Sequence, residues 1–147
     1  MKSKLFLSLI SVMLVGASAF AAGIGYIDYG KVQENFPLAQ SAIKEIDAKA
    51  LEIQQYMVDK EKQYKTLDTP LKKQNFEEVT AKELQAKEEA LLKLKNQKEE
   101  LVYTKIREAA NKVLVEQNLE AIVDFRVMFV GGVDVSDAVI QKLKAAK

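Results

Sequence analysis

Apolar residues recur at alternating steps of four and three through the middle of the chain, between about residues 38 and 118. A repeat of this kind predicts a helix that packs through one narrow stripe, as in a coiled coil. The first stripe contains one charged residue, Lys60. Its members are Ala39, Ile43, Ile46, Ala50, Ile53, Met57, Lys60, Tyr64 and Leu67.

The helical pattern breaks once, at Asp68-Thr69-Pro70. Thr69 suits the N-cap of a second helix and Pro70 its first position, so we expect this helix to run to about Asn118. Its stripe is less regular because Glu83, Lys87 and Lys98 lie close to it. The apolar members are Phe76, Val79, Leu84, Leu91, Leu94, Leu101, Ile106 and Val113. The two helices predict a hairpin arm over residues 38–118, with its turn near 67–70.

Both ends of the chain have a strand-like pattern instead. β-Branched and aromatic residues favour strands at 24–29, 121–125 and 127–130, and Gly131-Gly132 favours a turn. Residues 30–36 suit a helical turn. A terminal helix is expected over 134–146, capped by Asp134 or Ser136. Its inward side chains are Val139, Ile140 and Leu143.

These ends, residues 22–37 and 119–147, are expected to form one small β-rich head. A head of this size rarely buries enough apolar surface to be stable alone. The chain has no cysteine to provide a disulfide, and strand edges can pair with another subunit. We therefore expect an α+β fold: a β-rich oligomerisation body that carries a long antiparallel helical-hairpin, or coiled-coil, arm.

Residues 1–21 have the pattern of a signal peptide. Lys2 and Lys4 precede an apolar run, and Ala19 and Ala21 fit the small-residue cleavage rule. An uncleaved anchor is the alternative, but the run is short for a membrane span. We expect export and cleavage near Ala21, and the periplasm is the most economical compartment.

Charge and composition exclude several functions. The net charge is +1, and removal of the leader takes away two lysines, so a near-neutral chain is not expected to bind nucleic acid. The chain has no His, Cys or Trp, which excludes Ser-His-Asp and Cys-His catalysis and the common zinc sites. We find no catalytic, cofactor-binding or metal site and expect no enzyme activity.

Two features near the hairpin turn leave alternatives open. Five lysines and two acidic residues lie between 60 and 75. They form either an ordinary solvated tip or a weak positive patch suited to anionic partners or lipid head groups. Aromatic residues and a methionine gather there as well. They form either the helix–helix seam or an adaptable, non-specific apolar surface.

The motifs at the two ends resemble one known family. Gly25-Tyr26-Ile27-Asp28, then Ala121-Ile122-Val123-Asp124 and Gly131-Gly132-Val133-Asp134, resemble the Skp (OmpH-like) family of periplasmic chaperones. The resemblance covers the chain after the leader. It implies a homotrimer held by a β-rich body, with three arms around a cavity. It also implies an ATP-independent holdase that keeps unfolded outer-membrane β-barrel proteins from aggregating before membrane insertion.

The resemblance places oligomerisation in the strands at the two ends, and the basic and aromatic residues near the hairpin turn are the expected client-binding residues. An envelope scaffold or coiled-coil adaptor without chaperone activity is the alternative function. Contact of the arm tips with anionic lipid is a further expectation. The expected client-binding residues of the arm are Tyr56, Met57, Lys60, Tyr64, Lys65, Lys72, Lys73 and Phe76. The expected oligomerisation residues are Ile24, Tyr26, Ile27, Ile122, Val123 and Phe125.

Overall fold

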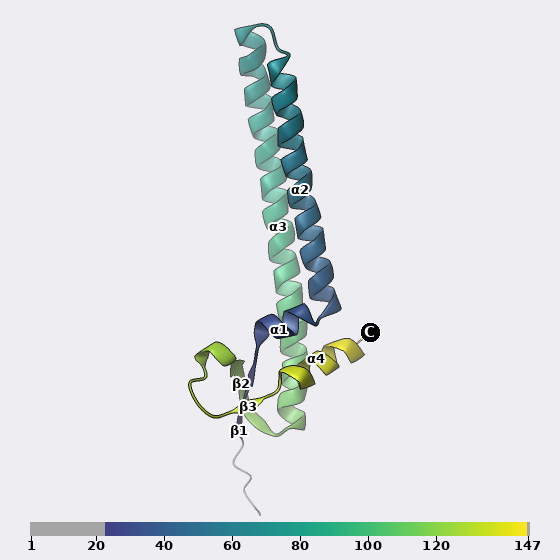
Figure 1. The fold of residues 1–147 in the computed structure, drawn as a ribbon, viewed down its shortest axis with the longest axis vertical. Coiled ribbons are helices and arrows are strands. Elements are labelled where there is room, and N and C mark those ends of the chain that lie inside the picture. Colours follow the sequence, from purple (N-terminus) through teal and green to yellow (C-terminus); the bar gives the residue numbers. More distant parts are fainter. Residues whose placement is uncertain (1–22, 147) are drawn as a thin grey trace, which may run out of the picture.

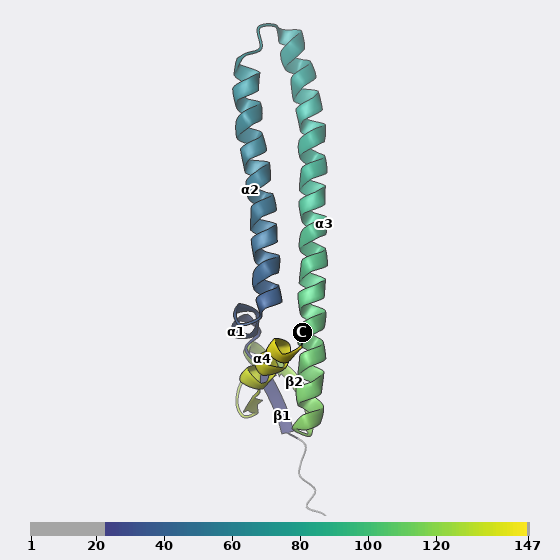
Figure 2. The ribbon, with the colours of Figure 1, turned by 90° about the vertical axis from the view of Figure 1, so that its right-hand side faces the viewer.

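Two long antiparallel helices form an arm that projects from a small head (Figures 1 and 2). The structure is a computed structural model and describes residues 23–146 of the 147. The signal peptide expected at 1–21 lies outside the described residues. The elements are β1 (Gly23–Ile27), α1 (Tyr29–Glu34), α2 (Pro37–Lys65), α3 (Pro70–Glu116), β2 (Leu119–Asp124), a 3-10 turn (Phe125–Val127), β3 (Val133–Asp134) and α4 (Ser136–Ala145). This arrangement confirms the α+β fold with a long helical hairpin.

Local signals fix the ends of the hairpin helices. The Thr69 hydroxyl accepts a hydrogen bond from the backbone N–H of Lys72 at 3.3 Å, and Pro70 opens α3. Pro37 opens α2 in the same way. A proline at the first helical position costs no hydrogen bond, because that N–H has no partner within the helix. The predicted cap and both helix starts are therefore confirmed.

The head contains a three-stranded sheet in the order β2-β1-β3, and both strand pairs are parallel. Gly25 lies opposite Ile122 in the central strand. A Cβ at Gly25 would lie 2.8 Å from Cδ1 of Leu119, so a larger residue would require the Leu119 side chain to shift. Side chains alternate between the two faces, and Gly25 and Ile27 turn toward the helices.

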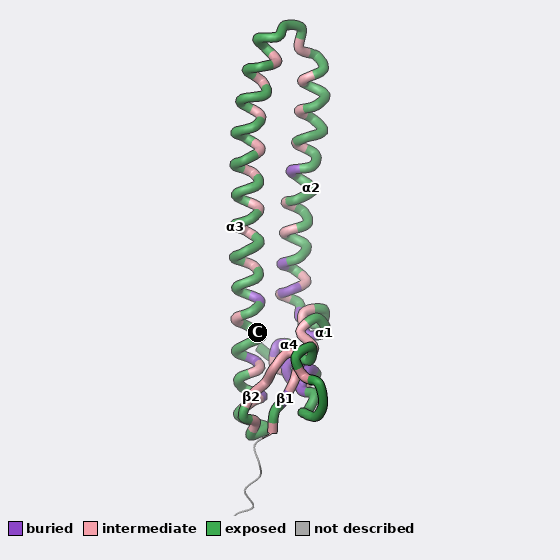
Figure 3. Tube along the Cα trace, turned by 90° about the vertical axis from the view of Figure 1, so that its left-hand side faces the viewer, coloured by how far each residue is buried: buried purple, intermediate pink, exposed green. Residues whose placement is uncertain are grey.

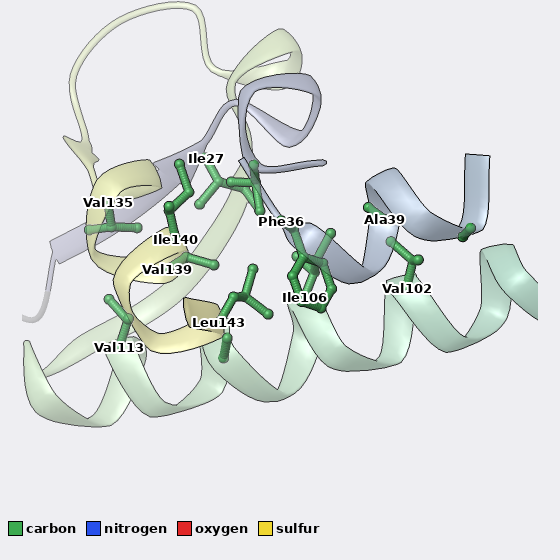
Figure 4. Packing of buried hydrophobic residues seen from close by; sticks show 13 residues of the cluster. Ile27, Phe36, Ala39, Val102, Ile106, Val113, Val135, Val139, Ile140 and Leu143 are labelled. Carbon is green, nitrogen blue, oxygen red and sulfur yellow. The ribbon is translucent and has the colours of Figure 1, made fainter. Parts of the chain in front are cut away.

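The hydrophobic core lies where α3 and α4 pack against the sheet and α1 (Figure 4). It extends into the base of the arm through Ala39, Ala42 and Val102. Beyond the base, the arm is mostly exposed or half-buried (Figure 3). The inward residues predicted for the terminal helix, Val139, Ile140 and Leu143, are all buried here, which confirms that prediction. The head and the base of the arm thus share one core.

The chain after β2 differs from its prediction. The strand expected at 127–130 is wrong, because the chain turns through Phe125–Val127 and then runs as a loop. The Asp124 carboxylate accepts from the backbone N–H of Arg126 and closes this turn. The N-cap of α4 is Val135, so the predicted cap at Asp134 or Ser136 is also wrong. The Asp134 carboxylate still accepts from the Ser136 N–H.

The residues that form the helix–helix seam differ from the predicted stripe at several positions on each helix. On α2, Ile43 and Met57 are about half exposed, at 46% and 52%, while Ala42 is buried. On α3, Val79 and Leu101 are exposed. A stripe with steps of four and three shares every other position with one that has steps of three and four. Where the two differ, the prediction took the more apolar of two adjacent residues, and the structure places the other one in the seam. The residues that replace the predicted ones in the seam are Ala42, Lys49 and Tyr56 on α2, and Thr80 and Val102 on α3.

Ser136 ties the start of α4 to the end of β1. Its side chain is fully buried, accepts from the Asp28 N–H at 2.9 Å and donates to the Asp134 carboxylate at 2.6 Å. We expect Ser136→Ala to lower the free energy of unfolding by about 1–3 kcal/mol, because it leaves a buried N–H without a partner. Urea unfolding measures this change. The exposed Ser41→Ala is the control, and an equal loss in both variants would contradict the assigned role.

Candidate functional site

An apolar groove lies between α2 and α3 in the distal half of the arm. Its volume is about 480 Å³, and we call it the arm groove. Five of the residues predicted to bind clients line it, whereas Lys65, Lys72 and Lys73 do not. Thr80 and Leu84 also line the groove, although neither was predicted to bind clients. The groove includes Tyr56, Met57, Tyr64, Phe76, Thr80 and Leu84.

A polar cluster crosses the seam beside the arm groove. The Glu83 carboxylate accepts from the Tyr56 hydroxyl and pairs with the Lys60 ammonium at 2.8 Å. The same ammonium lies 5.1 Å from the Tyr56 ring centre and 5.4 Å from that of Phe76. The Lys87 ammonium also lies over the Tyr56 ring, 4.8 Å from its centre. Charges and rings thus take the place of a continuous apolar seam.

These contacts shift the pKa values of the cluster in directions that favour the ion pair. The hydrogen bond from Lys60, followed by that from Tyr56, lowers the pKa of Glu83. The hydrogen bond to Glu83 raises the pKa of Lys60. A lowered carboxyl pKa contributes stability above the unfolded value, near 4.3, and this contribution is lost as the pH falls through the folded value. Acid therefore weakens the seam at this point.

We expect the distal arm to loosen in acid, once the pH has fallen far enough to protonate Glu83 despite its lowered pKa. The chain has no cysteine, so spin labels at Val58→Cys and Val79→Cys, on the two helices, report the separation. Acid should broaden the measured distance distribution in the wild type. Glu83→Gln should be broad already at neutral pH and respond little to acid. An identical acid response in both proteins would contradict the role of Glu83.

The lysines at the hairpin turn are mostly paired. The Lys65 ammonium lies 2.6 Å from the Glu61 carboxylate and that of Lys72 lies 2.8 Å from Asp68. Lys73 instead lies over the Tyr64 ring, 5.3 Å from its centre. Exposed pairs of this kind are weak and exchange with other anions. The tip therefore keeps cationic groups that a competing anion can reach.

The predicted oligomerisation residues divide between two sides of the sheet. Ile27 is buried in the core of its own chain and Ile122 packs against that core. Ile24 and Tyr26 alternate with the core-facing residues of β1, and Val123 lies opposite Tyr26 in the parallel register. These three residues therefore lie on the face away from the helices. We call this side the outer face of the sheet.

A loop of exposed apolar residues borders the outer face. Phe129 is fully exposed, and Val130 is 82% exposed. Phe125, a predicted oligomerisation residue, is exposed at the start of the same segment. Phe129 and Val130 were missed as surface contacts because an apolar run next to a strand pattern was assigned to a further strand. Their exposure shows that these two side chains do not pack into the core of their own chain.

A second groove, of about 470 Å³, lies beside the edge strand β2 and is bordered by α3. Tyr29, Tyr103 and Ile122 are among its lining residues. At its rim, the Arg126 guanidinium binds both oxygens of Asp124 at 2.8 Å. This hydrogen bonding lowers the pKa of Asp124 to about 2, so the rim carries an ion pair through the physiological range. An open strand edge and an apolar groove therefore lie together on the head.

Within residues 23–146, no cluster of three or more His, Cys, Asp or Glu side chains is placed to hold a metal ion. In the same part of the chain, no helix is both long enough and apolar enough to span a membrane.

Comparison with known proteins identifies the family. Residues 23–143 match the family model described as outer membrane protein (OmpH-like). The chain therefore belongs to the OmpH-like family. The predicted family resemblance is confirmed.

A crystal structure of an OmpH-like protein from Caulobacter crescentus CB15 is similar to this chain. The match has 15% sequence identity, covers 86% of each chain and has a TM-score of 0.40. No curated protein sequence matches the chain.

Proposed function

We propose that this chain is an ATP-independent periplasmic holdase that binds unfolded outer-membrane β-barrel proteins and prevents their aggregation before insertion. The observation that carries the proposal is the arm, which holds an apolar groove and exposed apolar side chains far from the core. An unfolded barrel strand has alternating apolar residues and an unpaired backbone, so it aggregates readily. Many weak contacts along an arm can hold such a strand without imposing a structure. No catalytic step is part of this function.

We propose further that the active form is a homotrimer joined through the head. Fully parallel sheets occur almost only with both faces covered, and here the helices cover one face. Ile24, Tyr26, Val123 and Phe125 supply apolar surface on the outer side. A neighbouring subunit would cover this surface and the open edge of β2. Ile27 and Ile122 would act indirectly, by holding the sheet on its own core.

The aggregation of a purified, urea-unfolded outer-membrane barrel protein on dilution tests the holdase proposal. Light scattering should stay low when the chain is present at about one trimer per client, over a range of salt concentrations. Unsuppressed aggregation at every salt concentration would exclude the proposal and favour a scaffold or adaptor role. Contact of the arm tips with anionic lipid stays a prediction, supported by the weakly paired tip lysines.

A further inference from the structure

We infer that the arm groove receives one aromatic side chain of an unfolded outer-membrane β-strand, and that the Thr80 hydroxyl forms a hydrogen bond to the bound segment. This inference rests on the proposed function, because it names the part of the client that the arm recognises. The groove's shape, an unpaired buried hydroxyl and two flanking cations support it independently of one another.

The shape of the groove suits a single ring. Its volume of about 480 Å³ is within the usual range of small-molecule sites, roughly 300–1,000 Å³. The rings of Tyr64 and Phe76 have centroids 6.2 Å apart and planes tilted by 49°, the geometry of favourable aromatic contacts. Met57, from α2, adds a flexible side chain that adapts to occupants of different shape. A third ring can join this group.

Thr80 supplies a polar group that lacks a partner. Its hydroxyl oxygen is buried and makes no hydrogen bond with any described residue. By contrast, the hydroxyl of Thr104, further along the same helix, donates to the Glu100 carboxylate. Buried hydroxyl groups are nearly always bonded, so an exception within a groove points to a ligand that completes it. An extended client has free backbone N–H and C=O groups that can do so.

Two lysines beside the groove favour an aromatic occupant over an aliphatic one. The Lys60 ammonium lies 5.4 Å from the centre of the Phe76 ring, and that of Lys73 lies 5.3 Å from that of Tyr64. Ammonium groups attract the face of a ring but gain nothing from an alkyl chain. Transmembrane β-strands carry aromatic residues at both membrane interfaces. Aromatic recognition would therefore apply to clients of many sequences.

The absence of tryptophan in the chain allows a direct test. The probe is a short synthetic peptide of alternating valine and threonine with one central tryptophan, whose fluorescence reports burial of the indole. Thr80→Val keeps the side-chain shape and should weaken binding about fivefold through loss of one hydrogen bond. It should also raise the unfolding temperature of the free protein. The matched control, Thr104→Val, should do neither.

Two further measurements sharpen the test. Phe76→Ala removes one wall of the groove and should weaken binding about tenfold or more. The peptide with leucine in place of tryptophan should compete poorly. Equal binding by the Thr80→Val and Thr104→Val variants would overturn the inference, and so would equal competition by the leucine peptide. A change in the mass of the assembly in groove variants, without a change in peptide affinity, would assign the groove to a second copy and overturn it as well.

The inference and the proposed function fail in different ways. If the wild type suppresses aggregation of the barrel protein while Thr80→Val binds the tryptophan peptide as the wild type does, the inference fails and the holdase function stands. If the wild type suppresses no aggregation, the holdase function fails first, whatever the peptide affinity.

Discussion

Phe129→Asp is expected to convert the proposed trimer into monomers. Phe129 is fully exposed in the single chain, so the substitution costs the fold of that chain little. Phe129 lines one small hollow with Tyr26 and Phe125, so we expect it to join the apolar contact of the proposed trimer. Each copy would lose about 1.5–3 kcal/mol of apolar burial, and a new carboxylate would have to leave water. Size exclusion coupled to light scattering measures the resulting mass.

Leu92→Asp is the matched control for this prediction. Leu92 is also a large exposed apolar residue, at 59%, but it lies on the arm rather than on the head. Its variant should remain a trimer with unchanged helix content by circular dichroism. A Phe129→Asp protein that keeps the trimer mass would exclude Phe129 from the interface.

Replacing residues 57–84 with a short glycine-containing turn is expected to abolish suppression of client aggregation while the trimer remains. The core reaches only the base of the arm, through Ala39, Ala42 and Val102, and none of its members lies within the removed segment. Ile53, buried further along α2, is retained as well. The shortened chain loses the arm groove and the reach of the arm, so it should fold and assemble without enclosing a client.

Two readouts separate this outcome from misfolding. The shortened protein should show the trimer mass and a cooperative urea transition. Its light-scattering trace with the unfolded barrel protein should match the trace without any added protein. Suppression equal to that of the full-length chain would move client binding from the arm to the head.

The ends of the arm were predictable because their signals are local. Thr69 and Pro70 cap and open α3 whatever the rest of the chain does, and Pro37 opens α2. The register of the seam was not predictable in the same way. Ala42 and Ile43 are adjacent apolar residues, so the pattern is compatible with either one facing the partner helix. Which one is buried depends on the surface that α3 presents.

The turn after β2 and the arm groove depend on side-chain contacts that the pattern of apolar and polar residues does not show. The turn after β2 forms because the Asp124 side chain bonds to the backbone N–H of Arg126, which ends the strand before the apolar run at 127–130. The arm groove required the packing of both helices. Thr80 was overlooked because the adjacent Val79 is apolar and was assigned to the predicted stripe instead. Site residues chosen for aromatic and basic character still included Tyr56, Tyr64 and Phe76 in the groove.

The mass of the purified mature protein, alone and with an unfolded outer-membrane barrel protein, tests the central claim most directly. Size exclusion coupled to light scattering should give a trimer alone, and a complex of about one client per trimer after mixing. A stable monomer that forms no complex, while the barrel protein aggregates, would contradict the account.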